Sequence, residues 1–420
     1  MRPSMSEAEL AARLRSVPWP ALAGCLPQVR AAVERVLAGE PAERVLDRAL
    51  REPAFGRDER AVMAEAVFGV GLWRRRLAYQ AGSDATGALL FALLRDLAGL
   101  PEELAGELSG LRAPFPPPRP PPCELATRWS LPDWLAACLV RKLGADGAEA
   151  FARAVNRPGP IALRANLLRT SVEALKARLA AEGVPTRAGA HARTCLVVEA
   201  PRANLLPLPA YREGLFEVQD EGSQLLALLV DAHPGETVLE LCAGAGGKTL
   251  ALAAELGNAG ALHAFDVDAS KLARLEQRAR RAGVANLRVH RGTLPESLAV
   301  DRVFVDAPCS ELGTLRRGPD LRFRLEPATF PALERTQREL LARAARHVRP
   351  GGRLVYATCT LRPEENEDPV AAFLAARPDF CLVPPTCLPE AFRRGPFFEA
   401  LPHLHGTDGF FAAVFERRPA

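Results

Sequence analysis

TVLELCAGAGGKTLALAAEL, residues 237–256, decides the fold class of this chain. Its first five residues, TVLEL, are typical of a strand, a glycine-rich turn follows, and the remainder has the apolar spacing of a helix. Residues 260–283 repeat the order of strand and helix, and further strands are predicted within 286–292, 301–308 and 351–359. Such repeats build a mostly parallel sheet covered by helices on both faces. We therefore expect an α/β domain that binds ligands at the carboxyl ends of its strands.

Other regions precede this domain, as a length of 420 residues leads one to expect. Residues 1–112 have Ala, Leu, Arg and Glu at helical spacing and are expected to be all helical. Residues 113–123, APFPPPRPPPC, predict a proline-rich linker, and 124–157 predict connecting helices. Residues 158–220 indicate strand, helix and further strands, which predicts a small α+β module before the α/β domain at 221–420.

Composition sets limits on location and partners. The net charge of +4 permits an anionic partner without requiring one. The nine cysteines include no C-x-x-C pair, so we expect free thiols in a reducing compartment and no metal site. The first residues lack the apolar core of an export signal, and no apolar run approaches the roughly 20 residues of a membrane span. These features predict a cytoplasmic protein with no membrane attachment.

The glycine-rich turn allows more than one ligand. A phosphate-binding Walker A loop would end in Gly247 and Lys248, but its first glycine position holds Cys242. With Asp306 as the magnesium acid, a P-loop ATPase is nevertheless a concrete rival. Asp266, at the end of the next strand, suits the ribose of a dinucleotide or of S-adenosylmethionine. The turn therefore indicates a nucleotide or nucleoside ligand and leaves its class open.

Two phrases place a cysteine at the exit of a buried strand. They are VFVDAPCSEL, residues 303–312, and LVYATCTLRPEEN, residues 354–366. Either cysteine alone would more often be a small buried apolar residue. Methylating carbon 5 of cytosine requires a thiolate that adds to carbon 6, an acid that supports ring nitrogen 3, and a group that removes the carbon 5 proton. Cys359, Asp306 and Cys309 match these requirements in type.

At this point the motifs resemble a known family. The phrases LCAGAGGKT, FDVD, DRVFVDAPCSELGTLRRGPDLRFR, LVYATCTLRPEENED and GTDGFFAAVFER are similar, in order and spacing, to those of the RsmB/Sun RNA cytosine-5 methyltransferases. The match spans roughly 200–417, with a similar RNA-binding module just upstream. The helical start is similar to the NusB-like domain of bacterial RsmB proteins. The resemblance implies a class I, Rossmann-like methyltransferase domain and S-adenosylmethionine as the cofactor.

The resemblance also implies residue roles. Cys359 becomes the nucleophile, Cys309 assists product release, and Asp306 supports the cytosine ring. The residues implied to hold the cofactor are Cys242, Ala243, Gly244, Ala245, Gly246, Gly247, Lys248, Asp266, Thr293 and Asp306. Two of them depart from the family pattern, which has proline at position 245 and aspartate at position 293; a threonine hydroxyl can still donate or accept a hydrogen bond.

The implied substrate is an unpaired or flipped cytosine, because the base inside a duplex is out of reach of Cys359. Phosphate contacts are predicted for Arg164, Arg316 and Arg317. The NusB-like start favours small-subunit (16S) rRNA as the substrate, with tRNA as the nearest rival, and no obligate protein partner is evident. A protein of another class, an RNA-binding assembly factor without catalysis, is an alternative that the combination of Cys359, Cys309 and Asp306 argues against.

Overall fold

The computed structural model describes residues 12–51, 55–199, 204–318 and 320–419. The chain forms two compact units. The first comprises Met1–Pro158 together with Leu315–Pro327, and the second comprises Gly159–Thr314 and Ala328–Ala420. Among the residues described, no helix is both long enough and apolar enough to cross a membrane.

The first unit is helical, as its spacing of apolar residues predicts. The central helix α4 (Arg57–Ala81) buries Val62, Val70, Trp73 and Leu77 along one side. The other helical elements of this unit are η1 (Trp19–Gly24), α2 (Leu26–Leu37), α3 (Ala42–Ala49), α5 (Thr86–Ala92), η2 (Leu93–Leu97), α6 (Glu102–Ser109), α7 (Leu125–Arg128), α8 (Asp133–Val155) and α14 (Leu321–Arg324). Helix α8 is broken at Gly144, where φ is 72°.

One segment lies in the first unit although the sequence places it inside the α/β domain. Leu315–Pro327 contains α14, and the Arg322 side chain on that helix is completely buried. Its Nη1 donates to Asn156 Oδ1 over 2.6 Å, and Asn156 is the residue that directly follows α8. A buried guanidinium needs such acceptors, which explains why this segment packs with α8. The division of the chain into five successive regions otherwise remains a prediction.

A small antiparallel sheet begins the second unit. Its strand order is β2-β3-β1-β4, with β1 (Ala162–Ala165), β2 (Thr186–Ala188), β3 (Cys195–Val198) and β4 (Phe216–Val218). Helix α9 (Val172–Ala181) begins at the cap residue Ser171, whose hydroxyl accepts from the Ala174 N–H, and buries Leu175 and Leu179 against this sheet. The short helix α10 (Pro209–Arg212) precedes β4. The predicted α+β character of this region matches these elements.

The large sheet has the order β11-β12-β13-β9-β8-β5-β6-β7, with β10 paired to β13. Its strands are β5 (Thr237–Leu241), β6 (Ala261–Phe265), β7 (Leu287–His290), β8 (Val300–Asp306), β9 (Val348–Thr358), β10 (Phe380–Val383), β11 (Arg393–Arg394), β12 (Phe397–Ala400) and β13 (Phe410–Arg417). Strands β5 to β9 pair in parallel, and the strands after β9 pair antiparallel at one end. The predicted α/β class with a mostly parallel core is confirmed.

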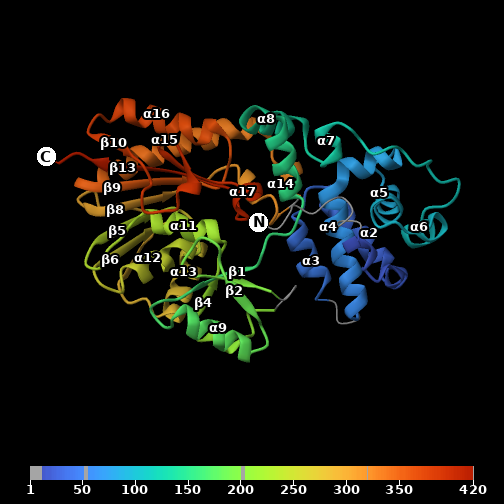
Figure 1. The fold of residues 1–420 in the computed structure, drawn as a ribbon, viewed down its shortest axis with the longest axis horizontal. Helices are drawn as coiled ribbons and strands as arrows, with labels where there is room; N and C mark the ends of the chain where they lie inside the picture. The colour runs from blue at the N-terminus through green and yellow to red at the C-terminus, as the bar shows by residue number, and fades with distance from the viewer. Residues whose placement is uncertain (1–11, 52–54, 200–203, 319, 420) are drawn as a thin grey trace. The chain divides into compact units, whose positions relative to one another are not determined.

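Helices cover both faces of this sheet (Figure 1). Alternate strand residues point to opposite faces, so Val238 and Phe304 pack in one core and Leu239 and Val303 in another. The first face is covered by α11 (Glu221–Leu229), α12 (Gly247–Glu255) and α13 (Ala269–Ala282). The second face is covered by α15 (Phe330–His347) and α16 (Glu367–Ala376). Short elements η3 (Leu312–Thr314), η4 (Pro327–Thr329), η5 (Pro363–Glu365), η6 (Glu390–Phe392) and α17 (Pro402–His405) connect the rest.

Candidate active site

The two cysteine phrases end neighbouring strands. Strands β8 and β9 pair in parallel with Asp306 opposite Ala357, so both strands end at the same edge of the sheet. Cys309 lies shortly after β8, and Cys359 directly follows Thr358, the last residue of β9. The two sulfur atoms are 3.3 Å apart, and the Cys359 backbone N–H donates to the Cys309 sulfur over 3.3 Å. The structure therefore brings together the thiols that the sequence selects.

The surroundings of Cys359 favour a neutral thiol in the resting protein. Its pKa is raised well above the usual value, first by the hydrogen bond with Cys309 and then by burial. The negative charges of Asp306 and Glu311 raise the pKa further. Since the thiolate is the nucleophilic form, Cys359 must give up a proton before it can attack an electrophilic carbon.

Asp306, the last residue of β8, forms an ion pair with Lys248. The Lys248 Nζ atom lies 2.6 Å from Asp306 Oδ2, and Lys248 belongs to the first turn of α12. Burial alone would lower the pKa of Lys248, but the charge and hydrogen bond of Asp306 raise it overall. The pair therefore places a carboxylate and an ammonium group at the sheet edge that carries both thiols.

The glycine-rich turn runs from the end of β5 to the start of α12. Cys242 and Gly244 have φ angles of 61° and 56°, and Gly246 has φ of 88° at the helix N-cap. A side chain at Gly246 would also collide with Leu275, whose Cγ would lie 2.8 Å from the added Cβ. The carbonyl of Ala245, where the family pattern has proline, accepts from Arg278 Nη1 over 2.6 Å. The turn is thus held in a left-handed conformation without proline.

Asp266 lies beside this turn. It follows the last residue of β6, and its Oδ2 accepts from the Gly244 backbone N–H over 2.8 Å. Its Oδ1 accepts from the Asp268 backbone N–H over 2.8 Å. The next residue, Val267, leaves 90% of its surface exposed, which is unusual for an apolar side chain beside a buried acid. The sequence does not single out Val267, although an apolar residue between two aspartates is a visible signal.

The turn has room for a nucleoside ligand. A Cβ added at Gly244 or Gly247 would have no atom within 4 Å, so the backbone there faces open space. Asp266 carries the carboxylate that a ribose hydroxyl requires. The residues from Cys242 to Lys248, with Asp266, therefore fit S-adenosylmethionine. Thr293 is exposed in the connection that follows β7, at the same edge of the parallel strands.

The three arginines predicted to contact RNA differ in their surroundings. Arg164 is 3% exposed, and its Nε donates to Gln219 Oε1 over 2.7 Å. Because this guanidinium is enclosed by protein, the prediction that Arg164 contacts phosphate is corrected: its hydrogen bonds go to Gln219 and to the Leu250 carbonyl. Arg316 and Arg317 are half-buried in the segment Leu315–Pro327 of the first unit, and their contact with RNA remains a prediction.

The sequence does not single out Glu240, a buried acid in the middle of β5. It is 1% exposed, and burial raises its pKa to about 8, with a further contribution from the charge of Asp306. The neighbouring Thr249 side chain and the charge of Lys248 act in the opposite direction. One carboxylate oxygen, Oε2, has no hydrogen-bond partner among the described residues. A single acid in the otherwise apolar run TVLEL is the signal that marks it.

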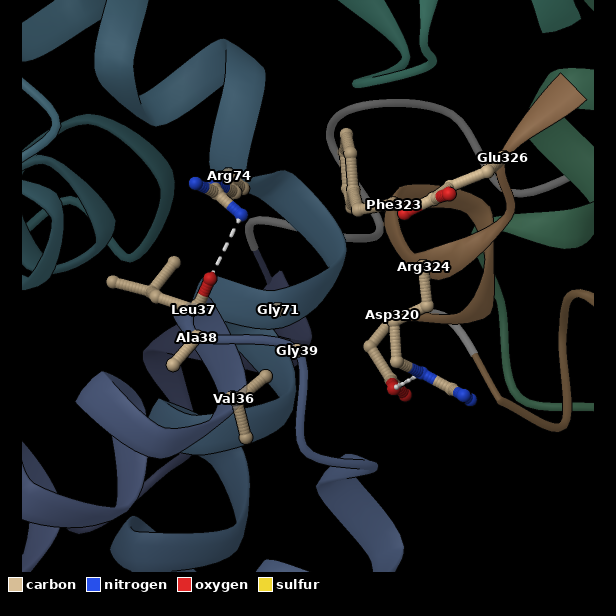
Figure 2. A pocket seen from close by; sticks show the side chains of 10 residues that line it. All are labelled: Val36, Leu37, Ala38, Gly39, Gly71, Arg74, Asp320, Phe323, Arg324 and Glu326. Carbon is tan, nitrogen blue, oxygen red and sulfur yellow. Dashed lines mark hydrogen bonds and ion pairs between the residues drawn. The ribbon is translucent and has the colours of Figure 1, made fainter. Parts of the chain in front are cut away.

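A separate cavity of about 350 Å³ lies in the first unit (Figure 2). Its two arginines are engaged: Arg74 Nη1 donates to the Leu37 carbonyl over 3.2 Å, and Arg324 Nε donates to Asp320 Oδ2 over 2.8 Å. None of the predicted catalytic or cofactor residues lines it. This cavity is therefore distinct from the candidate active site.

Two family models match the chain. Residues 227–416 match the model described as 16S rRNA methyltransferase RsmB/F. Residues 131–204 match the model of the RsmF/B-like ferredoxin-like domain. The first match includes the glycine-rich turn and both cysteine phrases, and the second includes β1, α9 and β3.

Curated relatives are about one third identical to this chain over the aligned residues. The probable ribosomal RNA small subunit methyltransferase B of Synechocystis sp. is 35% identical over 70% of this chain and 68% of its own length. The protein of the same description from Bacillus subtilis is 32% identical over 70% of this chain and 68% of its own length.

Solved structures share the fold. The crystal structure of PH0851 matches with a TM-score of 0.76 and 27% identity, covering 96% of this chain and 99% of the other. The NSun6 structure from Pyrococcus horikoshii with SFG matches with a TM-score of 0.61 and 21% identity, covering 69% of this chain and 99% of the other. At that identity the second likeness concerns the fold alone.

Proposed function

This chain belongs to the RsmB/F family of S-adenosylmethionine-dependent methyltransferases, and we propose that it methylates carbon 5 of a cytidine in small-subunit rRNA. The family and cofactor predicted from the sequence motifs are confirmed. The names of the curated relatives support small-subunit rRNA as the substrate. The NusB-like character of the helical start and a cytoplasmic location remain predictions.

A single observation carries the proposed chemistry. Two thiols stand 3.3 Å apart at one edge of the sheet, and Asp306 ends the strand that leads to one of them. A methyltransferase acting on a nucleophilic nitrogen or oxygen needs neither thiol, whereas carbon 5 of cytosine reacts only after the ring has been activated by addition at carbon 6. Paired thiols beside a carboxyl group therefore support cytosine carbon 5 as the target atom.

We assign the steps to this chain's own residues. Cys359 gives its proton to the Asp306 carboxylate, and its sulfur bonds to carbon 6, which moves the electrons of the 5,6 double bond towards carbon 5. The protonated Asp306 then donates a hydrogen bond to ring nitrogen 3 and stabilises the negative charge that develops there. After methylation Cys309, as a thiolate that has released its own proton to solvent, takes the proton from carbon 5. The electrons of that bond restore the 5,6 double bond as the bond between carbon 6 and Cys359 breaks, and the released sulfur takes its proton back from Asp306.

The cofactor is assigned to the turn between β5 and α12. Bound S-adenosylmethionine supplies an electrophilic methyl group on a positively charged sulfur. The backbone from Cys242 to Lys248 would surround it, Asp266 would bind its ribose, and Thr293 and Asp306 would complete the site. The family matches argue against the rival P-loop ATPase.

Transfer of labelled methyl from S-adenosylmethionine to two unmodified RNAs tests this proposal. Small-subunit rRNA and tRNA are each incubated with the protein, and the labelled nucleoside is identified after digestion. We expect label in 5-methylcytidine from rRNA. Label in tRNA alone would overturn the substrate, and label in another nucleoside would overturn the chemistry. No label in either RNA, with cofactor still bound, would favour an assembly factor without catalysis.

A further inference from the structure

A buried polar network lies beneath the loop that carries Cys309. Its centre is Glu365, which ends η5 and has no exposed surface. Glu365 Oε2 accepts from the Ser310 backbone N–H over 2.9 Å and from Gln337 Nε2 over 3.0 Å. Glu365 Oε1 accepts from the Ser310 hydroxyl and from Arg362 Nη1, the latter over 3.1 Å. One carboxylate thus joins the loop after β8, the loop after β9 and helix α15.

These bonds hold the backbone on both sides of Cys309. Ser310, the next residue, is bonded to Glu365 through its N–H and its hydroxyl. Gln337 Nε2, which donates to Glu365, also donates to the carbonyl of Pro308, the preceding residue, over 2.9 Å. The position of the Cys309 sulfur is therefore set by a residue that does not contact it.

The neighbouring residue Asn366 forms hydrogen bonds with the residues on both sides of Cys359. Its Oδ1 accepts from the Thr358 hydroxyl over 2.6 Å, and its Nδ2 donates to the Thr360 carbonyl over 3.0 Å. Thr358 and Thr360 flank Cys359 in the sequence. The hydroxyls of Thr360 and Ser310, 2.7 Å apart, connect the two halves of the network. Consecutive side chains, Glu365 and Asn366, therefore each fix one thiol-bearing loop.

We infer that Glu365 and Asn366 are positioning residues that hold the two thiols in register for reaction with the base. The inference rests on the proposed function, because it assumes that both thiols act on one cytosine. A carboxylate accepts hydrogen bonds only, and all four contacts of Glu365 are donors, so the network is matched in polarity. Fully satisfied buried networks rigidify their surroundings, and reacting groups must be placed to within roughly 0.5 Å.

The substitution Glu365→Gln tests the role with little change in shape. An amide has one accepting oxygen, so its NH2 group must face donors from Ser310, Gln337 or Arg362. We expect single-turnover methyl transfer to fall about 10- to 100-fold through misplacement of the thiols, while S-adenosylmethionine affinity stays within about twofold. Glu339→Gln is the matched control, because it makes the same change at an exposed position of α15.

A second readout reports thiol geometry without RNA. Diamide, a dithiol oxidant, accepts two hydrogens from Cys309 and Cys359, is reduced to its hydrazine, and leaves a disulfide between them. The product is identified by peptide mass mapping, which separates it from disulfides of the other cysteines. We expect Glu365→Gln to form this disulfide about tenfold more slowly than wild type, and Glu339→Gln to match wild type.

The two readouts separate the outcomes. Slower cross-linking together with slower methylation supports the inference, and wild-type rates in both would overturn it. Slower methylation with unchanged cross-linking would also overturn it, because Glu365 would then act on something other than the thiols. If neither the wild type nor any variant methylates RNA, slower disulfide formation in Glu365→Gln would support the positioning role and defeat the proposed function. If Glu365→Gln does not fold, Ser310→Ala replaces it, since this variant removes one hydroxyl and keeps the backbone N–H.

Discussion

The loops after β8 and β9 and the loops after β5 and β6 lie at one edge of the sheet but differ in character. The first pair is closed: the Cys309 and Cys359 sulfurs are 3.3 Å apart above a buried network. The second pair is open: Gly244 and Gly247 face empty space, and Val267 is 90% exposed. In the proposed reaction the closed pair would hold the reacting thiols, and the open pair would bind the cofactor.

The largest loss of methyl transfer is expected when the proposed nucleophile, which lies in the closed pair of loops, is replaced. Cys359→Ala should reduce methyl transfer by on the order of 10⁴-fold or more, because no covalent bond to carbon 6 can form. Cofactor affinity should not change, since Cys359 lies outside the open pair. Methyl transfer is measured under single-turnover conditions and affinity by calorimetry. Turnover in this variant near the wild-type rate would remove Cys359 from the nucleophile role.

Loss of the other thiol should stop the reaction at a later point. Cys309→Ala should still form the bond between Cys359 and carbon 6 but should release product slowly, because the group that removes the carbon 5 proton is gone. A complex of protein and RNA that survives denaturant is therefore expected on gels. The double variant Cys309→Ala/Cys359→Ala is the control and should form none. An adduct that persists in the double variant would assign the nucleophile elsewhere.

The ion pair between Lys248 and Asp306 connects the open pair of loops with the closed pair. Lys248→Met should slow methyl transfer about 10- to 100-fold, since it leaves a partly buried carboxylate without its charge partner. Lys271→Met, which removes an exposed lysine from α13, is the matched control and should behave as wild type. Equal rates for the two variants would show that the ion pair has no part in the reaction.

Because Glu240 is buried in β5, just before the open turn, we expect the free energy of unfolding to depend on pH. The pKa of Glu240 is about 8 in the folded protein against an ordinary value of 4.5. As pH rises, Glu240 therefore ionises at a lower pH in the unfolded state than in the folded state. The free energy of unfolding should therefore fall as pH rises from about 4.5 to 8, by at most about 1.4 kcal/mol per pH unit. Glu240→Gln should remove this slope in urea titrations, and Glu173→Gln, at an exposed position of α9, should keep it. Parallel pH profiles for wild type and Glu240→Gln would refute the burial effect.

The smallest effect concerns the cofactor contact at position 293. Thr293→Asp should tighten S-adenosylmethionine binding about three- to tenfold, because a carboxylate accepts a stronger hydrogen bond than a hydroxyl. Thr336→Asp, which adds the same charge at an exposed position of α15, is the control for nonspecific electrostatic effects. Unchanged affinity in Thr293→Asp would remove Thr293 from the cofactor site.

Much of the molecule follows from local sequence patterns. The alternation of apolar runs and glycine-rich turns predicts β5, α12, β6 and α13, because strand and helix periodicities are properties of short segments. The same reasoning places Asp306, Cys309 and Cys359 at strand exits. Neighbouring parallel strands end at a common edge, so the meeting of the two thiols follows from topology once the order of the sheet is known.

What the sequence by itself determined is the α/β class and the methyltransferase family, and it also supplied the candidate catalytic positions. Tertiary structure alone decided which polar side chains are buried and with which partners. Arg164 forms part of the protein interior instead of facing RNA, Arg322 packs its segment with α8, and Glu365 lies beneath the thiol loops. The physical reason is that burial and hydrogen bonding of these groups depend on residues 55 to 166 positions away, which no local pattern encodes.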